Sequence, residues 1–278
     1  MSDGLTELFK KFETKWGLAF IGFVGFIIAL ELTLYNLAWE NEAIWFAIIF
    51  TWFFVIIGMY KLFGKWGLFT AFIINVCMLN LQVMQITSVW GLTTGAGGDA
   101  FNFLITDIIV EKYGRKEGMK CVGLGITAMI VFVSLMWLTT LLAAGEHAFV
   151  HEEYNAIFSL IPRIAGASLL AFIVAQTNDV LLFSKIRAKT KGKYLWLRNN
   201  VSTLTSQAID LVIFNLVAFW GLIPFSGIVE MGVVGYGQEI VFALTDTFFI
   251  YLAMAIVPLT FMGKDERIPA GVPEDVEA

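Results

Sequence analysis

Long runs of apolar residues without charge recur along this 278-residue chain, and they constrain its fold more than any other feature. About 20 such residues are needed to cross the roughly 30 Å of hydrocarbon in a bilayer. The chain is 58% hydrophobic and only 15% charged, whereas soluble chains carry about 25% charged residues. This composition excludes an ordinary soluble domain and predicts an all-α polytopic membrane protein.

The runs predict about eight membrane segments, one of which is short. The short segment, AFNFLITDIIVEKYG at 100–114, follows a glycine-rich stretch and cannot cross the bilayer alone. It fits a broken or half-depth helix whose irregular approach is buried in protein or lines a wet cavity. The full-length helices are predicted at 16–38, 43–61, 66–90, 119–144, 156–184, 199–222 and 238–262.

Basic residues occupy every second loop of this scheme. Lys and Arg lie before the first span and after the second, the short segment, the 156–184 span and the last span. The intervening loops, WENEA, GAGGDA, GEHAFVHEEYN and PFSGIVEMG, contain neither. This pattern predicts a protein of the cell membrane with both termini in the cytoplasm. The tail 263–278 has no apolar periodicity and is predicted to be solvated.

Two neighbouring spans each carry a carboxylate with a glutamine three residues before it, namely Asp179 with Gln176 and Asp210 with Gln207. A charge at the centre of a membrane helix costs roughly 3 kcal/mol even on insertion-based scales. Helix rise places Asp210 near the midplane and Asp179 toward the inner end of its helix. The pattern indicates a polar site within the middle and inner part of the bundle.

The short segment adds a further acid pair, because Asp107 and Glu111 are four residues apart and share a helix face. All these acids have a structural alternative, in which they form buried ion pairs or contact the basic loop 185–198. That alternative remains open for each of them at this level.

Arg163 lies near the outer end of its helix, about 24 Å of helix rise from Asp179, so these two residues cannot pair. The expected partners at similar depth are Asp246, Glu239 or Glu31. We therefore predict that Arg163 and Asp246 are structural counter-ions and not ligands.

Motifs of metal or covalent catalysis are missing from the sequence. His147 and His151 are four residues apart beside two glutamates, but this is not the HExxH order, and the chain has no other histidine. Cys77 and Cys121 lie in apolar runs and are read as small core residues. No nucleophile elbow, phosphate loop or nucleotide fingerprint is present. No catalytic metal, cofactor, enzymatic activity or nucleic-acid partner is expected, and the chain cannot hydrolyse ATP itself.

Residues 102–222 resemble the queuosine precursor transporters, part of the vitamin uptake transporter group. The resemblance rests on TDIIVEKYG (106–114), PRIAGASLLAFIVAQTNDVLLFS (162–184) and WLRNNVSTLTSQAIDLVIFNLVAFWG (196–221). The last motif is the most specific. In it, the residues that stand in the family's pattern and spacing are Arg198, Asn199, Ser202, Thr203, Gln207, Asp210 and Phe214.

The resemblance implies a six-helix core related to the substrate-binding subunits of energy-coupling-factor vitamin importers. Residues 66–262 would form this core, 1–65 a two-span extension, and 263–278 the solvated tail. The chain departs from the family in this extension and in lacking the proline usually found before the short segment, near Asn102.

The resemblance also implies import of the 7-deazaguanine bases queuine, 7-cyano-7-deazaguanine and 7-aminomethyl-7-deazaguanine. Such a base presents a two-donor edge that one carboxylate can accept, a carbonyl for an amide donor and a flat face for an aromatic wall. Asp179 and Asp210 are the expected acceptors for that edge. The full set of expected substrate-binding residues is Asp107, Glu111, Gln176, Asp179, Asn199, Gln207 and Asp210.

Other readings remain compatible with the sequence. The chain could be a substrate-binding membrane subunit for a vitamin or purine-like ligand that depends on a separate ATPase module. It could also transport a different vitamin, and an intramembrane enzyme is the weakest alternative. Whether the chain forms a homo-oligomer is left open.

Overall fold

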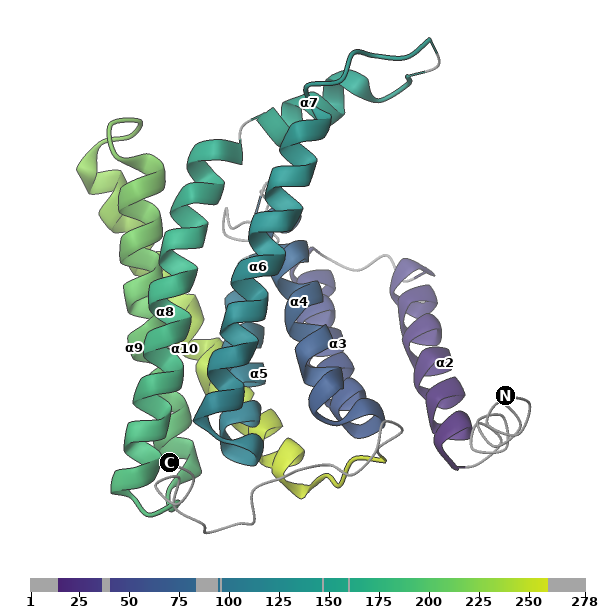
Figure 1. Cartoon of the computed structure of the whole chain (residues 1–278), viewed down its shortest axis with the longest axis vertical. Helices are drawn as coiled ribbons and strands as arrows, with labels where there is room; N and C mark the ends of the chain where they lie inside the picture. The colour runs from purple at the N-terminus through teal and green to yellow at the C-terminus, as the bar shows by residue number, and fades with distance from the viewer. Residues whose placement is uncertain are drawn as a thin grey trace.

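The computed structural model describes residues 15–36, 41–83, 95, 97–146, 148–159 and 161–259, and the regular structure in this part is helical. Five of the helices there are long and apolar enough to cross a membrane, so the chain is a multi-pass membrane protein. The helices are α2 (Lys15–Asn36), α3 (Asn41–Phe63), α4 (Lys65–Gln82), α5 (Gly98–Tyr113), α6 (Arg115–Thr139), α7 (His151–Ser159), α8 (Ile161–Lys189), α9 (Leu195–Phe219) and α10 (Phe225–Ala255) (Figure 1).

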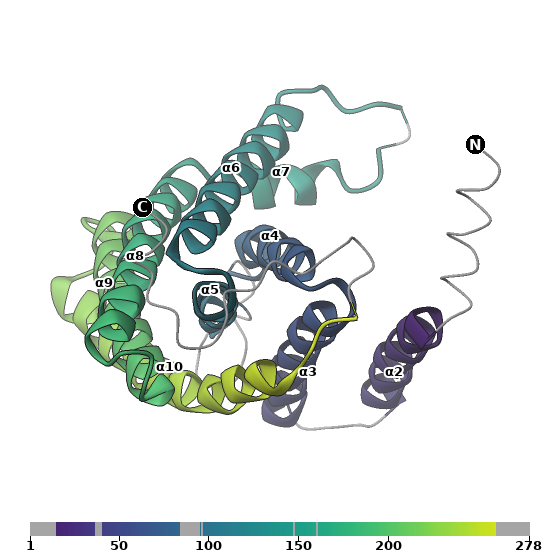
Figure 2. The same cartoon turned by 60° about the horizontal axis from the view of Figure 1, so that its bottom comes forward.

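Helix α5 forms the centre of the bundle. It is surrounded by α3, α4, α6, α8, α9 and α10 (Figure 2), and every residue from Ala100 to Val110 is buried. A helix that is apolar on most of its faces needs such an enclosure. The prediction of a separate short segment at 100–114 is therefore confirmed, with a start two residues earlier.

Glycines set both ends of α5. Gly97 precedes the helix with φ 81°, and Gly114 follows it with φ 86°, a region that side chains with a Cβ rarely adopt. A Cβ on Gly97 would also lie 2.2 Å from Cε2 of Phe242. The glycine-rich approach to α5 thus provides both the turn and the close packing against α10.

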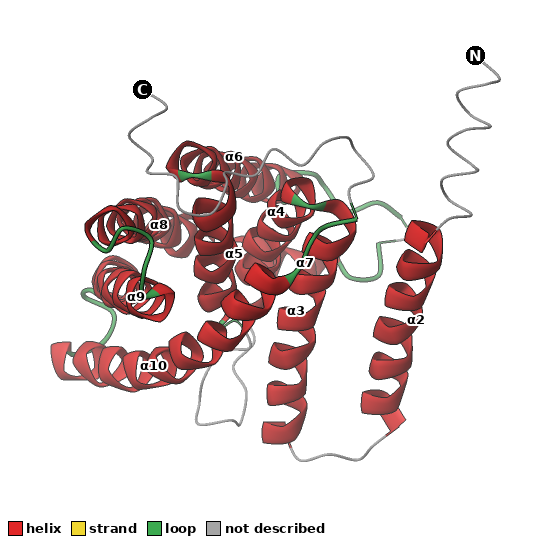
Figure 3. Ribbon diagram, turned by 90° about the horizontal axis from the view of Figure 1, so that it is seen from below, coloured by secondary structure: helices red, strands yellow, loops and turns green. Residues whose placement is uncertain are grey.

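Helices α8 and α9 form a long antiparallel hairpin, and α10 then slants across the bundle from α9 to α3 (Figures 2 and 3). The prediction that PFSGIVEMG is an outer loop is wrong, because α10 begins at Phe225 directly after Pro224. Pro224 has φ −58°, which suits the entrance to a helix. The polar residues of this stretch lie on a helix instead of in a solvated loop.

The first two helices differ in how they join the bundle. Helix α3 is integrated, since Phe53 stacks on Phe249 of α10 with ring centroids 4.4 Å apart and Trp52 donates to Asn75 of α4 at 2.8 Å. Helix α2 lies at the edge beside α3 (Figure 1). The division at residue 65 remains a prediction, but these contacts attach α3 to the predicted core.

Candidate functional site

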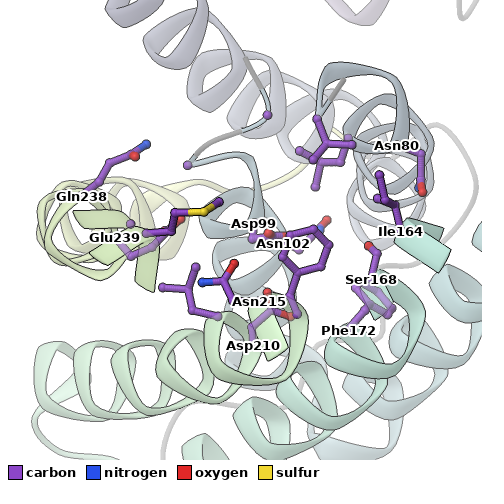
Figure 4. A pocket seen from close by; sticks show the side chains of 18 of the residues that line it. Asn80, Asp99, Asn102, Ile164, Ser168, Phe172, Asp210, Asn215, Gln238 and Glu239 are labelled. Carbon is purple, nitrogen blue, oxygen red and sulfur yellow. The ribbon is translucent and has the colours of Figure 1, made fainter. Parts of the chain in front are cut away.

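A cavity of about 570 Å³ lies between α4, α5, α6, α8, α9 and α10 (Figure 4). It is lined by the C-terminal parts of α4 and α9 and by the N-terminal parts of α5, α8 and α10, so it lies toward one end of the bundle. At the opposite end, α4 begins with Lys65, α6 with Arg115, and α8 ends with Lys189. We call these the cavity end and the basic end.

Three carboxylates converge in the cavity. Asp99 is in the first turn of α5, Asp210 in α9 and Glu239 in α10, and all three line the same space (Figure 4). They lie close enough to repel one another electrostatically. Glu239 is held in place by Gln207, whose Nε2 donates to Glu239 Oε2 at 2.7 Å. The arrangement attracts hydrogen-bond donors and positive charge.

A relay of amides places one donor in the same cavity. Trp52 Nε1 donates to Asn75 Oδ1 at 2.8 Å, and Asn75 Nδ2 donates to Asn102 Oδ1 at 2.9 Å. The indole can only donate, so this chain fixes the orientation of both amides. Asn102 Nδ2, which lies close to Asp99, has no partner that meets hydrogen-bond geometry within the described part of the chain. The amide has two hydrogens, so it can donate to a ligand as well as to Asp99.

Apolar side chains complete the walls. Phe172 of α8 and Phe214 of α9 line the cavity together with aliphatic residues of α4 and α10. Pockets of 300–1,000 Å³ with apolar walls and a few directed polar groups are typical of small-molecule sites. The cavity therefore suits a flat polar ligand of the size of a purine.

Of the seven expected substrate-binding residues, the structure places only Asp210 in the cavity wall. Gln207 does not line the cavity, but its side chain binds the cavity residue Glu239 and positions it. The other five lie closer to the basic end, in two further groups. The single polar site expected from the sequence is therefore divided into three layers along the bundle.

The middle layer is the deep carboxyl cluster, which we define as Asp107, Asp179 and Asp246. Each of the three is 0% exposed. Asn199 Nδ2 donates to Asp246 Oδ1 at 2.7 Å, and Thr106 Oγ1 lies 3.4 Å from both Gln176 Oε1 and Asp179 Oδ2. None of these residues lines the cavity.

The third layer, at the basic end, is an ion cluster of Glu111, Arg187 and Arg198. Glu111 Oε2 lies 2.6 Å from Arg198 Nη2 and 3.3 Å from Arg187 Nε. Arg198 also donates to the backbone oxygens of Gly192 and Lys193, at 3.2 and 2.9 Å. Glu111 is therefore part of a structural ion pair between α5, α8 and α9 in this conformation, as the alternative reading allowed.

Arg163 and Asp246 were expected to form an ion pair, but Asp246 lies at a different depth of the bundle from Arg163. The side chain of Arg163 lies outside the described residues. Asp246 is close to Asp179, which is sixteen residues and about 24 Å of helix rise from Arg163 along α8. The partner that the structure gives Asp246 is Asn199.

Sequence reasoning missed several cavity residues, namely Asp99, Asn102, Glu230, Gln238 and Glu239. Asp99, Glu230 and Gln238 fell in segments read as outer loops or their borders, where polar residues need no explanation. Glu239 was considered only as a partner of Arg163. The short predicted segment and its glycine-rich approach were the usable signal, because Gly95, Gly97 and Asp99 all line the cavity.

Comparisons with known proteins agree with this architecture. The family described as "Putative vitamin uptake transporter" matches residues 99–253, from the first turn of α5 through most of α10. A Bacillus subtilis (strain 168) protein named "Probable queuosine precursor transporter" is 33% identical over 230 residues, which are 82% of this chain and 98% of that protein. An Escherichia coli (strain K12) protein named "Queuosine precursor transporter" is 30% identical over 146 residues, which are 51% of this chain and 62% of that protein.

No solved structure matches the chain. The Bacillus subtilis match is too long to fit within residues 66–278, so it extends into the part that precedes α4. That relative therefore shares at least part of the segment that the sequence set apart as an extension.

Proposed function

The chain belongs to the queuosine precursor transporter family, and we propose that it imports 7-deazaguanine precursors of queuosine across the cell membrane. As a member of this family it is a transporter and not an enzyme. The observation that carries the choice of ligand is the cavity that Asp99, Asp210 and Asn102 line together with two phenylalanines.

The chemistry of that cavity complements a deazaguanine. The ring N–H and the exocyclic amine of the base form a two-donor edge, and a carboxylate such as Asp210 accepts both donors. Asn102 Nδ2, which has no partner meeting hydrogen-bond geometry among the described residues, suits the carbonyl of the base. Phe172 and Phe214 offer surfaces for the flat ring.

We further infer that the cavity end faces the outside and that both termini lie in the cytoplasm. Lysines and arginines of the described part gather at the basic end, around Lys65, Arg115 and Lys189, which matches the positive-inside rule. In this conformation the cavity lies toward the outside, while Glu111, Arg187 and Arg198 hold α5, α8 and α9 together at the inner end. Transport then requires that this ion cluster opens, by alternating access.

Binding by the purified full-length chain tests the proposal. We expect queuine and 7-cyano-7-deazaguanine to bind and to raise the thermal unfolding midpoint, whereas riboflavin and biotin do not. Asp210→Asn turns one acceptor into a donor opposite the two-donor edge, and should weaken binding at least tenfold. Glu152→Gln, at an exposed position on α7, is the matched control and should bind as the wild type does.

The same protein in sealed vesicles separates a self-sufficient transporter from a subunit that needs an ATPase module. Exchange of labelled 7-cyano-7-deazaguanine across the membrane without any added protein supports the transporter. Binding without exchange would favour the subunit, and equal binding of Asp210→Asn and wild type would reject the assigned role of the cavity.

A further inference from the structure

The deep carboxyl cluster does not line the cavity but lies next to it, toward the basic end. Asp179 follows the cavity residue Phe172 by seven residues on α8, and Asp246 follows Glu239 by seven on α10. Two helical turns place each pair on one face, about 10 Å apart. The cluster thus separates the cavity from the ion cluster at the inner end.

Among the described residues, no lysine or arginine forms an ion pair with this cluster. Arg198 acts on Asp107 electrostatically, but its hydrogen bonds go to Glu111 and to two backbone oxygens. Arg187 also pairs with Glu111. The other charged groups that act on the cluster are acids, because Glu239 of α10 repels Asp246. Three carboxylates would therefore share a buried, negatively charged region of the membrane.

Several buried acceptors of this region have no donor. Both oxygens of Asp107, Oδ1 of Asp179 and Oδ2 of Asp246 are buried and have no partner within the described part of the chain. The amide oxygen of Asn199, a residue that is 0% exposed, is also without a donor, although its Nδ2 donates into the cluster. A buried acceptor without a donor is costly. Protonation of a carboxylate converts one acceptor into a donor.

The carboxylates of Asp107 and Asp179 lie close enough to act on each other, although no hydrogen bond between them is formed in the described part of the chain. Two carboxylates cannot hydrogen-bond without a proton, and two adjacent charges would repel in this buried site. The described Asp, Glu, His and Cys side chains form no group that could hold a metal ion instead. A proton bound to this pair would lower its negative charge and supply a donor to an oxygen that has none.

We propose that the Asp107–Asp179 pair binds the proton that drives uptake, so that each substrate enters together with a proton. This proposal rests on the proposed function. The proton leaves to the inside once the inner ion cluster has opened. The charged Asp107 can then interact with Arg198, since Asp107 and Glu111 are four residues apart on one face of α5.

The test uses the full-length protein in sealed vesicles that contain a pH-sensitive dye, with 7-cyano-7-deazaguanine as a substrate that carries no net charge. For wild type, addition of substrate outside should acidify the lumen. An acid-outside gradient should drive accumulation of up to roughly tenfold per pH unit for one proton per substrate, and a protonophore should abolish it. These measurements need no variant and therefore do not depend on how a substitution folds.

The variants locate the proton. Asp107→Asn and Asp179→Asn should keep substrate binding and passive exchange while they lose gradient-driven accumulation and lumen acidification. The control Glu152→Gln should keep substrate binding, passive exchange, gradient-driven accumulation and lumen acidification. Exchange by wild type without any proton movement would overturn the proton site and leave the proposed substrate intact, as would full gradient-driven accumulation by both variants. Absence of both binding and exchange in wild type would overturn the proposed function and this proposal together.

Discussion

Arg198 and Asp210 lie on the same helix, α9, twelve residues apart, and belong to opposite ends of the bundle. Arg198 closes the basic end through its 2.6 Å contact with Glu111, whereas Asp210 lines the cavity. The helix rise between them is about 18 Å. A shift of α9 relative to α5 would therefore change the cavity and the ion cluster together.

Glu111→Gln should lower the thermal unfolding midpoint in detergent by roughly 5–10 °C, because it leaves Arg198, which is 1% exposed, without its counter-ion. The matched control is Glu117→Gln, whose partners Lys65 and Lys120 are 20% and 65% exposed. Because these lysines reach more solvent than Arg198 does, the contacts of Glu117 should contribute less than about 1 kcal/mol. If both variants lowered the unfolding midpoint equally, the burial of Arg198 would not explain the stability of this ion pair.

Gln207→Met should weaken binding of 7-cyano-7-deazaguanine about tenfold, although Gln207 does not line the cavity. The substitution removes the donor that holds Glu239, and hydrogen bonds to charged groups contribute about 1.5–3 kcal/mol. Equilibrium binding to the purified protein measures the effect. Thr205→Val, on the exposed side of the same helix, should bind normally, and an unaltered affinity in Gln207→Met would argue against this support of the site.

Gly97→Ala should destabilise the protein by at least about 1–2 kcal/mol, because of its positive φ and the contact with Phe242. Combining it with Phe242→Ala should relieve the steric part only. Gly123→Ala on α6 is the control, since a Cβ there meets nothing within 4 Å and alanine favours a helix. Thermal unfolding of the three variants should therefore show a decrease for both Gly97 variants and no loss for Gly123.

Phe53→Ala should destabilise the protein by roughly 3 kcal/mol, because Phe53 is 0% exposed and stacks on Phe249. Phe26→Ala on α2 removes a side chain that is 51% exposed and should have little effect in detergent. Denaturation midpoints measure both. Similar small effects would mean that α3, like α2, is a peripheral addition to the predicted core.

Hydropathy and loop charge predicted the membrane class, most of the spans and the separate short segment, because these depend on the length of apolar runs. They failed at the start of α10. Glu230 and Gln238 looked like residues of a loop and its border, yet they line a cavity on a helix. Hydropathy cannot distinguish a polar stretch that faces water outside the bundle from one that faces a cavity within it.

The site could be predicted only as an inventory of acids and amides. Asp210 was identified because a carboxylate within an apolar span is costly wherever it points. Asn102 gained its role from Trp52 and Asn75, which lie on other helices and orient its amide. Such a relay depends on the rotation of three helices about their axes, which no spacing within one segment specifies.

The sequence by itself determined that this chain is a helical membrane protein and that Asp179 and Asp210 lie at different depths, because helix rise per residue is constant. Tertiary structure decided that they belong to different layers. It placed Asp210 with Asp99 and Glu239 in the cavity and Asp179 with Asp107 and Asp246 in a closed cluster. The physical reason is packing, since only the arrangement of α5, α8, α9 and α10 selects which carboxylates meet.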